Sequence, residues 1–565
     1  MHPNLFLEAI RIWADRYGRA FLKLTETPIM VQRRTLLSKI RRNQDSDFGR
    51  KHDFDRIRTV EDFRKAMPVT DYAYVDPYVQ RVIAGDVGAL FGPGTRIIMF
   101  ALTSGTDGKP KHIPVTAEFL EEYKRSWRVW GSQAHRDHPR AFGHRILQIS
   151  SAWNESYTEK GIPCGSISGL NAAMQPWVIR QMYLPGRAVH LVKDPGAKAY
   201  LVARISTPRK VSLIISANPS SVLSVARAIA ERGEELVRDI HDGGIGEGFD
   251  VTRSVRQELR HRLRPDHAAA RRLGEALRRN GSLHPTDCWP ELGLVANWMG
   301  GTVQLYLEEY PRHFPGLPVR EIGLLASEGR MTITVSDGPG GVLDIGSHFF
   351  EFVPEEELEN PQPQTLTPGE LEVGRRYGMV VTTSSGLYRY NIRDVVLVEG
   401  FYGRTPVVSF LNKGNHIASM TGEKLTEHQV VEALKRISKR TPACPERLLV
   451  NPAWAQTPHY SVTVEARPDD TVEWGEFVRL LDQELEGLNL EYRAKRQSGR
   501  LGDPVLSVVP EGTFDRLKEE HLARVGGRRE QYKHVFLVPQ VDYHRRFEVI
   551  RTVRGEPSPA RPVGK

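Results

Sequence analysis

The sequence contains little cysteine and no long apolar run. Among its 565 residues are three cysteines, Cys164, Cys288 and Cys444, which lie far apart and are odd in number. This arrangement excludes a disulfide framework and the closely spaced ligands of a structural zinc site, so we expect a reducing, cytoplasmic location. No segment approaches the roughly 20 apolar residues of a membrane-spanning helix, and the N-terminus lacks a signal-peptide core. We therefore expect a soluble protein with no membrane partner.

Several catalytic motifs are also missing. The sequence has no Gly-x-Ser-x-Gly segment, and its 19 histidines include no His-Glu-x-x-His pair. These absences argue against an α/β-hydrolase and against a zinc peptidase. We also find no internal repeat and no low-complexity tract, which argues against a repeat architecture.

The chain is basic, with a formal net charge of +9. Its densest basic stretch, residues 253–279, also carries acidic residues and has leucines at near-helical intervals, which is typical of helices packed on a protein surface. No nucleic-acid recognition motif or aromatic stacking surface accompanies the charge. The sequence therefore predicts no nucleic-acid partner, although a positive field would attract small anions.

The pattern of apolar runs predicts two domains. About ninety residues of helical character end in the turn Gly92-Pro93-Gly94, and short strands such as 146–149 and 211–215 then alternate with helices such as 220–231. This alternation indicates βαβ units and parallel sheets. Residues 412–415, Asn-Lys-Gly-Asn, have a composition typical of a hinge, and a smaller α+β region begins after them. We expect an α/β fold with a large N-terminal domain at residues 1–412 and a small, mobile C-terminal domain at 413–565.

The segment Thr103-Ser104-Gly105-Thr106-Asp107-Gly108-Lys109-Pro110-Lys111 predicts a phosphate-binding loop. It follows the apolar run 97–102, which we expect to be a buried strand. Glycines let backbone amides turn toward an anion, while hydroxyls and lysines add donors and charge. The spacing does not fit a Walker loop, because a proline follows Lys109. The alternative is an ordinary solvated turn.

This loop resembles the phosphate-binding segment of adenylate-forming enzymes. Its continuation, Lys111-His112-Ile113-Pro114-Val115-Thr116, is similar to the Gretchen Hagen 3, or auxin-responsive promoter, family of acyl-acid amido synthetases. Three later segments agree with that family in the expected order: Ala326-Ser327-Glu328-Gly329, Phe349-Phe350-Glu351-Phe352-Val353-Pro354, and Tyr388-Arg389-Tyr390 leading to Asp394-Val395-Val396. Weaker agreement extends over most of the chain. The resemblance also implies a β-barrel-like part within the large domain.

The activity implied by the resemblance is an ATP-dependent ligation. A carboxylic acid would be activated as an acyl-adenylate, and its acyl group would pass to the amine of an amino acid. The implied partners are ATP with Mg²⁺, a small carboxylic acid and an amino acid, in a monomer or weak homo-oligomer. One alternative is an acyl-CoA ligase, which shares the first step but uses a thiol acceptor. Another is a nucleotide-binding scaffold without turnover.

The resemblance assigns the nucleotide site to residues in three segments. The expected nucleotide contacts are Thr103, Ser104, Gly105, Thr106, Lys111, Ala326, Ser327, Glu328, Tyr388 and Asp394. Glu328 would face the magnesium ion, since a carboxylate oxygen suits that cation. The alternative is an exposed loop glutamate. We expect Glu328 to follow a sheet strand at 324–326, a common position for ligand-binding residues.

Asp394 is the expected partner of the ribose hydroxyls, since a carboxylate can accept both hydrogen bonds. The alternative is a salt bridge with Arg389 or Arg393. The sequence also departs from the family pattern here, because Arg393 replaces the glycine that usually precedes this aspartate.

Two lysines of the small domain are candidates for a catalytic charge that neutralises the reacting phosphate. Lys533, in Gln531-Tyr532-Lys533, matches the family position better than Lys424, which lies just past the hinge. The acid itself is not identified by the sequence. An aromatic stripe of Phe119, Tyr123, Trp127 and Trp130 would form either the floor of its pocket or ordinary core.

Overall fold

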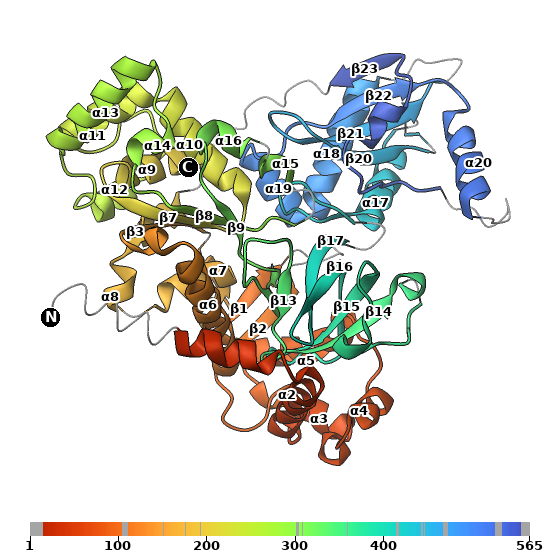
Figure 1. The fold of residues 1–565 in the computed structure, drawn as a ribbon. Helices are drawn as coiled ribbons and strands as arrows, with labels where there is room; N and C mark the ends of the chain where they lie inside the picture. Colours follow the sequence, from red (N-terminus) through yellow and green to blue (C-terminus); the bar gives the residue numbers. More distant parts are fainter. Residues whose placement is uncertain are drawn as a thin grey trace. The chain divides into compact units, whose positions relative to one another are not determined.

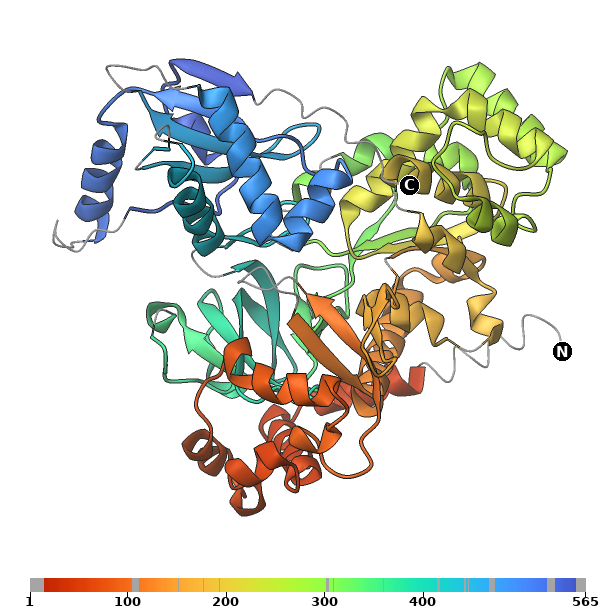
Figure 2. The same ribbon diagram turned by 180° about the vertical axis from the view of Figure 1, so that it is seen from behind.

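The computed structural model describes most of the chain as two compact units. The described residues are 15–103, 111–150, 152–175, 177–192, 194–300, 304–307, 309–358, 360–413, 417–441, 444–445, 447–466, 473–525 and 534–554. The first unit comprises Met1–Thr103 and His112–Asn412, and the second comprises Ser104–Lys111 and Lys413–Lys565. Figure 1 traces the elements of each unit along the chain, and Figure 2 shows them from behind.

Helices occupy the N-terminal region of the first unit, as predicted. They include α2 (Pro28–Asn43), α3 (Asp47–Lys51), α4 (Val60–Ala66) and α5 (Tyr72–Ile83). The start of α4 is fixed by a capping box, in which the Thr59 hydroxyl accepts from the Asp62 amide and the Asp62 carboxylate accepts from the Thr59 amide. Asp71 caps α5 with a single hydrogen bond, accepted by its side chain from the Tyr74 amide.

A parallel sheet confirms the predicted βαβ units. Its strands, in the order β6-β3-β7-β8-β9, are Tyr183–Leu184, Arg145–Ile149, Val211–Ser216, Leu294–Asn297 and Val319–Glu321. Apolar side chains of β3, β7 and β8 form a buried cluster with Val129, Trp130 and Ala134 of α6 (Ala117–Asp137). Helices α9 (Pro195–Ser206), α10 (Pro219–Glu231) and α14 (Pro285–Cys288) gather over the other face of this sheet (Figure 1).

Two further sheets complete the framework around the predicted site. The first has the order β2-β1-β5-β4, with β1 at Ile97–Thr103, β2 at Lys111–Thr116, β5 at Pro163–Gly165 and β4 at Ser156–Tyr157. The second has the order β12-β13-β17-β16-β15-β14, formed by Thr332–Ile333, Gly341–Leu343, Thr405–Lys413, Tyr390–Tyr402, Arg376–Thr382 and Phe349–Pro354. One apolar core joins both sheets to the N-terminal helices, with Leu36, Phe48, Phe100 and Phe350 among its buried members.

The second unit is an α+β structure, as expected. Its sheet has the order β20-β21-β22-β23, formed by Leu449–Ala453, His459–Glu465, Val505–Val509 and Arg551–Arg554. Helices α17 (Glu427–Ser438), α18 (Trp474–Leu488), α19 (Leu490–Gln497) and α20 (Thr513–Val525) belong to the same unit. Trp474, Phe477 and Leu481 of α18 pack in its apolar core.

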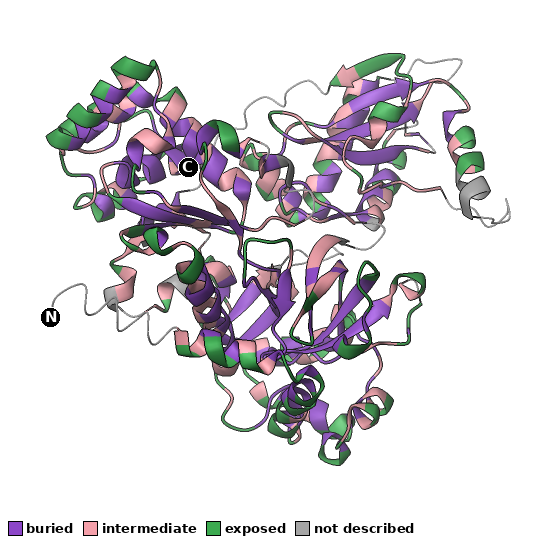
Figure 3. Ribbon diagram, in the orientation of Figure 1, coloured by how far each residue is buried: buried purple, intermediate pink, exposed green. Residues whose placement is uncertain are grey.

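The distribution of burial agrees with these assignments. Figure 3 shows the sheet strands largely buried and the outward faces of the peripheral helices exposed. No helix in the described part of the chain is long and apolar enough to cross a membrane. The predicted mixed α/β class is confirmed.

Candidate functional site

The predicted phosphate loop connects β1 to β2. Met99, Phe100 and Ala101 of β1 are fully buried, which confirms the predicted strand before the loop. Ser104, Gly105 and Thr106 lie outside the described residues, as does Lys533, and the side chain of Thr103 is not described. Their assigned roles therefore stay predictions. Lys111 begins β2, directly after the loop.

Glu328 follows the end of a strand, as expected, but this strand belongs to a two-stranded hairpin and not to the larger α/β sheet. The two-residue strands β10 (Leu325–Ala326) and β11 (Gly329–Arg330) pair antiparallel, so Ser327 and Glu328 form the turn between them. The Ser327 hydroxyl lies 3.4 Å from the carbonyl oxygen of Leu102 and donates to it. This contact places the hairpin turn beside the end of β1, where the phosphate loop begins.

The carboxylate of Glu328 is buried beside two tyrosines. Glu328 is 8% exposed, so the alternative of an exposed loop glutamate is wrong. Burial raises the pKa of the Tyr72 and Tyr390 hydroxyls, and the negative charge of Glu328 raises both further. Tyr72 also ties β2 to α5, because its hydroxyl accepts from the His112 amide at 2.9 Å. The charge of Glu328 therefore acts on Tyr72 of α5, which is tied to the start of β2, and on Tyr390 of β16.

The donor set at this position fits magnesium bound together with phosphate. Among the residues that the structure describes, no group of three or more His, Cys, Asp or Glu side chains could hold a metal ion. Mg²⁺ commonly takes only one or two protein carboxylates, with waters and substrate phosphate oxygens as its other ligands. Glu328 could supply that carboxylate next to the end of β1.

Asp394 lies within β16 and is 2% exposed. The residue before it, Arg393, has a φ of 58°, a left-handed conformation that glycine adopts most readily. Arg393 therefore holds a backbone conformation that a glycine at this position would adopt without strain. Arg389 is engaged elsewhere, since its guanidinium pairs with Glu351 at 2.9 Å and donates to the Met67 carbonyl. Because Arg389 pairs with Glu351, Arg393 remains as the other arginine of the proposed salt-bridge alternative for Asp394.

Tyr388 packs in the core of the first unit. Its ring is fully buried and stacks on Phe48 with centroids 5.2 Å apart, and its hydroxyl accepts a hydrogen bond from Asn43. The structure thus gives this side chain a packing role, and a direct contact with nucleotide stays a prediction. Tyr72, which the sequence analysis did not propose as a site residue although its segment agrees weakly with the family, feels the charge of Glu328.

Lys424 occupies a constrained turn in the second unit. Its φ is 49°, a left-handed value that costs energy for a lysine. The preceding side chain, Glu423, is fully buried and accepts from the Met420 and Thr421 amides at 2.7 Å and from the Tyr460 hydroxyl at 2.5 Å. Asn489 donates to the carbonyl of Glu423. A strained backbone conformation that neighbouring hydrogen bonds hold in place is typical of functional positions.

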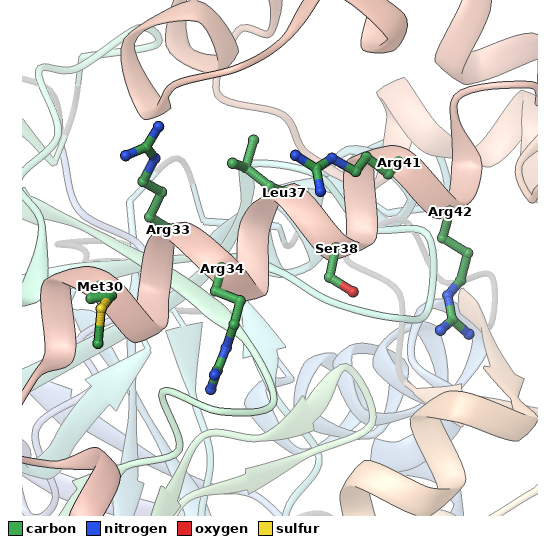
Figure 4. Close-up of a pocket in the computed structure, with 7 residues that line it drawn as sticks. All are labelled: Met30, Arg33, Arg34, Leu37, Ser38, Arg41 and Arg42. Carbon is green, nitrogen blue, oxygen red and sulfur yellow. The ribbon is translucent and has the colours of Figure 1, made fainter.

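A hollow of about 680 Å³ lies on the exposed face of α2, away from these motifs. Met30, Arg33, Arg34, Leu37, Ser38, Arg41 and Arg42 line it, and Figure 4 shows their side chains projecting from the one helix. None of the predicted site residues is among them. We therefore place the candidate site at the end of β1, the hairpin and β16, not at this hollow.

Models of one protein family match most of the chain. Residues 18–319 match the GH3 family N-terminal domain, residues 341–413 the GH3 family central domain, and residues 429–542 the GH3 family C-terminal domain. The order agrees with the order of the segments that suggested this family from the sequence.

Similar proteins and structures carry related names. The jasmonoyl–L-amino acid synthetase JAR6 of Nicotiana attenuata is 25% identical, with 91% of each chain covered. The indole-3-acetic acid-amido synthetase GH3.10 of Arabidopsis thaliana is 24% identical, with 92% of this chain and 94% of the relative covered. Among solved structures, AtGH3.15 acyl acid amido synthetase in complex with 2,4-DB has a TM-score of 0.64 at 21% identity, covering 95% of this chain and 97% of that one. This structural likeness supports the fold.

Proposed function

The chain belongs to the GH3 family, and we propose on that premise that it is an ATP-dependent ligase that joins a carboxylic acid to an amino acid. In the first step a carboxylate oxygen of the acid attacks the α-phosphorus of ATP, and pyrophosphate leaves. In the second step the amine of the amino acid attacks the acyl carbonyl carbon, AMP leaves with the electron pair of the broken bond, and the amine loses a proton.

The meeting of three distant segments carries this proposal. The Ser327 hydroxyl donates to the carbonyl of Leu102, so the hairpin adjoins the end of β1. The charge of Glu328 acts on the hydroxyls of Tyr72 and Tyr390, and Tyr390 begins β16. Negative charge accumulates on phosphate oxygens during adenylation, and catalysis depends on positioning and charge neutralisation there. A loop with amides and hydroxyls that follows the end of β1, together with a carboxylate that could hold Mg²⁺, would meet this need.

We assign the nucleotide contacts by segment. Ser104, Gly105 and Thr106 hold the β- and γ-phosphates, with Lys111 at the rim. Glu328 holds Mg²⁺, which would neutralise phosphate charge when bound. Asp394 accepts hydrogen bonds from the ribose hydroxyls.

The second unit supplies the mobile charge. Lys533 neutralises the α-phosphate while the adenylate forms, and movement of the small domain at residues 413–565 then opens the site to the amine. Lys424 is the second candidate for this charge, since its turn is held rigidly by Glu423 and Asn489. We further propose a cytoplasmic monomer or weak homo-oligomer.

Acid-dependent exchange of labelled pyrophosphate into ATP tests the first step. The purified chain would be assayed with Mg²⁺ and single carboxylic acids, including jasmonate, indole-3-acetate and benzoate. Exchange that requires one of these acids supports the proposal. ATP binding without exchange for any acid would support the alternative of a nucleotide-binding scaffold.

A further inference from the structure

The outward face of α2 carries four arginines and no acidic side chain. Figure 4 shows its side chains in two rows along the helix, with Arg33, Leu37 and Arg41 in one row and Met30, Arg34, Ser38 and Arg42 in the other. The members of each row are four positions apart, a spacing that makes side chains neighbours on one side of a helix. Because residues 28–43 include no aspartate or glutamate, the helix itself supplies nothing to balance this charge.

Other parts of the chain neutralise little of this charge. Arg42 pairs with Glu118 at 2.6 Å, whereas Arg33, Arg34 and Arg41 form no ion pair with any residue that the structure describes. Arg41 and Arg42 are in the last turn of α2, where the helix dipole favours positive charge. Arg33 and Arg34 lie in the middle of the helix, beyond the reach of that effect. Stabilisation of the helix therefore does not explain the whole cluster.

Two large apolar side chains are exposed at the N-terminal end of α2. Ile29 is 72% exposed and Met30 is 65% exposed, the highest values for large apolar side chains in the described part of the chain. Leu37 borders the hollow between the arginines. Basic side chains together with exposed apolar ones on one helix are typical of surfaces that contact a membrane interface.

The inner face of α2 holds the helix firmly on the first unit. Gln32 donates to the carbonyls of Ile345 at 2.9 Å and His348 at 2.7 Å. Asn43 donates to the Tyr388 hydroxyl at 2.7 Å. The backbone that carries the arginines is thus already ordered, which lowers the entropic cost of binding a partner.

We propose that the outward face of α2 binds the surface of an anionic phospholipid bilayer. The guanidinium groups of Arg33, Arg34 and Arg41 donate to phosphate oxygens of the lipids, whose geometry matches their parallel N–H groups. Ile29 and Met30 enter the boundary between headgroups and acyl chains. These apolar side chains favour a bilayer over a nucleic acid, whose backbone offers phosphates without an apolar layer beneath them.

This peripheral contact is separate from the proposed ligase activity, because none of the predicted site residues lies on α2. It needs no membrane-spanning helix, and it would replace the sequence-based expectation of no membrane partner.

Flotation of the full chain with lipid vesicles tests this surface. Phosphatidylcholine vesicles with and without phosphatidylserine would be compared at low and high salt. The wild type should bind the anionic vesicles far more tightly than the neutral ones, and salt should weaken the binding. The triple variant Arg33→Gln, Arg34→Gln and Arg41→Gln should bind anionic vesicles about thirtyfold less tightly or weaker still, because each arginine near such a surface contributes about fivefold.

A second variant tests the apolar contribution. Ile29→Ser combined with Met30→Ser should weaken binding to anionic vesicles by about tenfold and leave its salt dependence in place. Duplex DNA provides the competing probe. Binding of DNA through the same arginines, with no effect of the double variant on either probe, would overturn the bilayer and assign this face to a nucleic acid.

The exposed face of α13 (His267–Asn280) supplies the matched control. This helix also has four arginines, but it includes Glu275. The triple variant Arg271→Gln, Arg278→Gln and Arg279→Gln removes the same charge and should bind vesicles as the wild type does. The proposal is overturned if this control loses as much binding as the α2 triple variant, if the folded α2 variant binds like the wild type, or if phosphatidylserine does not strengthen wild-type binding. Melting temperatures close to the wild-type value establish that each variant is folded.

Discussion

Single residues around the site adopt conformations that their side chains alone do not favour. Arg389 and Arg393 both have left-handed φ values, 45° and 58°, on either side of Tyr390. Each costs energy that the surrounding structure must offset. At Arg389 the ion pair with Glu351 and the bond to the Met67 carbonyl hold the backbone in place. The sequence could identify Asp394 from its motif. It could not show that Arg393, directly before it, would adopt a left-handed backbone conformation.

We predict that Asp394→Ala weakens ATP binding. Loss of two hydrogen bonds to a charged acceptor, each worth roughly 1.5 to 3 kcal/mol, should raise the dissociation constant by more than about tenfold. Calorimetric titration with ATP measures the change, and Asp394→Asn, which keeps the shape, should lie between the alanine variant and the wild type. Unchanged ATP affinity with a lower melting temperature would make Asp394 a structural residue.

A buried histidine next to the hairpin predicts how stability depends on pH. His348 is almost fully buried, and a Cβ on Gly329 would lie 2.6 Å from its Nε2. Burial holds the pKa of His348 well below its ordinary value. Between the folded and unfolded values the unfolded chain binds more protons, so this contribution to stability is present above about pH 6.5 and is lost as pH falls.

This histidine should make the fold less stable at pH 5 than at pH 7, because the unfolded chain takes up a proton that the buried ring does not. Urea unfolding at the two pH values would measure the loss of stability. His348→Gln, which cannot titrate, should show a smaller loss of stability between the two pH values. An equal loss in both proteins would show that His348 protonates as readily in the folded chain as in the unfolded one.

Among the elements, long strands and helices were predictable and short ones were not. The runs at 97–102, 146–149 and 211–215 form β1, β3 and β7, and the helix expected at 220–231 forms α10, because each buries several apolar side chains in succession. The hairpin at Glu328 has strands of two residues, too short for any periodicity. Its position depends on contacts with Leu102 and His348, which are distant in the sequence.

Lys424 has a strained backbone conformation and is also a candidate catalytic residue, so one substitution tests both properties. Glycine avoids the cost of the left-handed conformation, so Lys424→Gly should stabilise the chain by about 1 kcal/mol or slightly less. If the lysine charge assists adenylation, the same variant should lower acid-dependent pyrophosphate exchange by about tenfold or more. Thermal unfolding and exchange assays measure the two effects.

Lys435 on α17 provides the control for that variant, because its side chain is 64% exposed and pairs only with Glu432 among the described residues. Lys435→Ala should change neither quantity. A less stable Lys424→Gly protein with full exchange activity would give the turn a purely structural role.

At the scale of the whole molecule, the sequence predicted the order of the motifs but not the contacts between them. Lys39 of α2, Glu122 of α6 and Ser384 form a buried network with distances of 2.6 to 3.0 Å, although up to 345 positions separate them. No local pattern marks such residues as partners. Tyr72 likewise reaches the site through the fold, because α5 brings it to the start of β2.

If the second unit provides a charge that only the adenylation step needs, removal of that charge should affect the two half-reactions unequally. Lys533→Ala should depress acid-dependent pyrophosphate exchange strongly, while acyl transfer from a supplied acyl-adenylate to an amino acid should largely survive. The reason is that a charge needed only during adenylation lowers one barrier, and each ~1.36 kcal/mol changes that rate about tenfold. Equal losses in both half-reactions would indicate a shared binding role or misfolding, and no loss in either would shift the assignment to Lys424.

Analysis of the products tests the proposed ligase activity most directly. The wild-type chain would be incubated with ATP, Mg²⁺, jasmonate, indole-3-acetate and benzoate, together with a mixture of amino acids and an equal concentration of CoA, and the products would be identified by mass spectrometry. We predict an amide with the mass of one acid plus one amino acid minus water, formed with one AMP and one pyrophosphate. Formation of only a CoA thioester, or of AMP and pyrophosphate without any amide, would contradict the assignment of an amino acid as the acceptor.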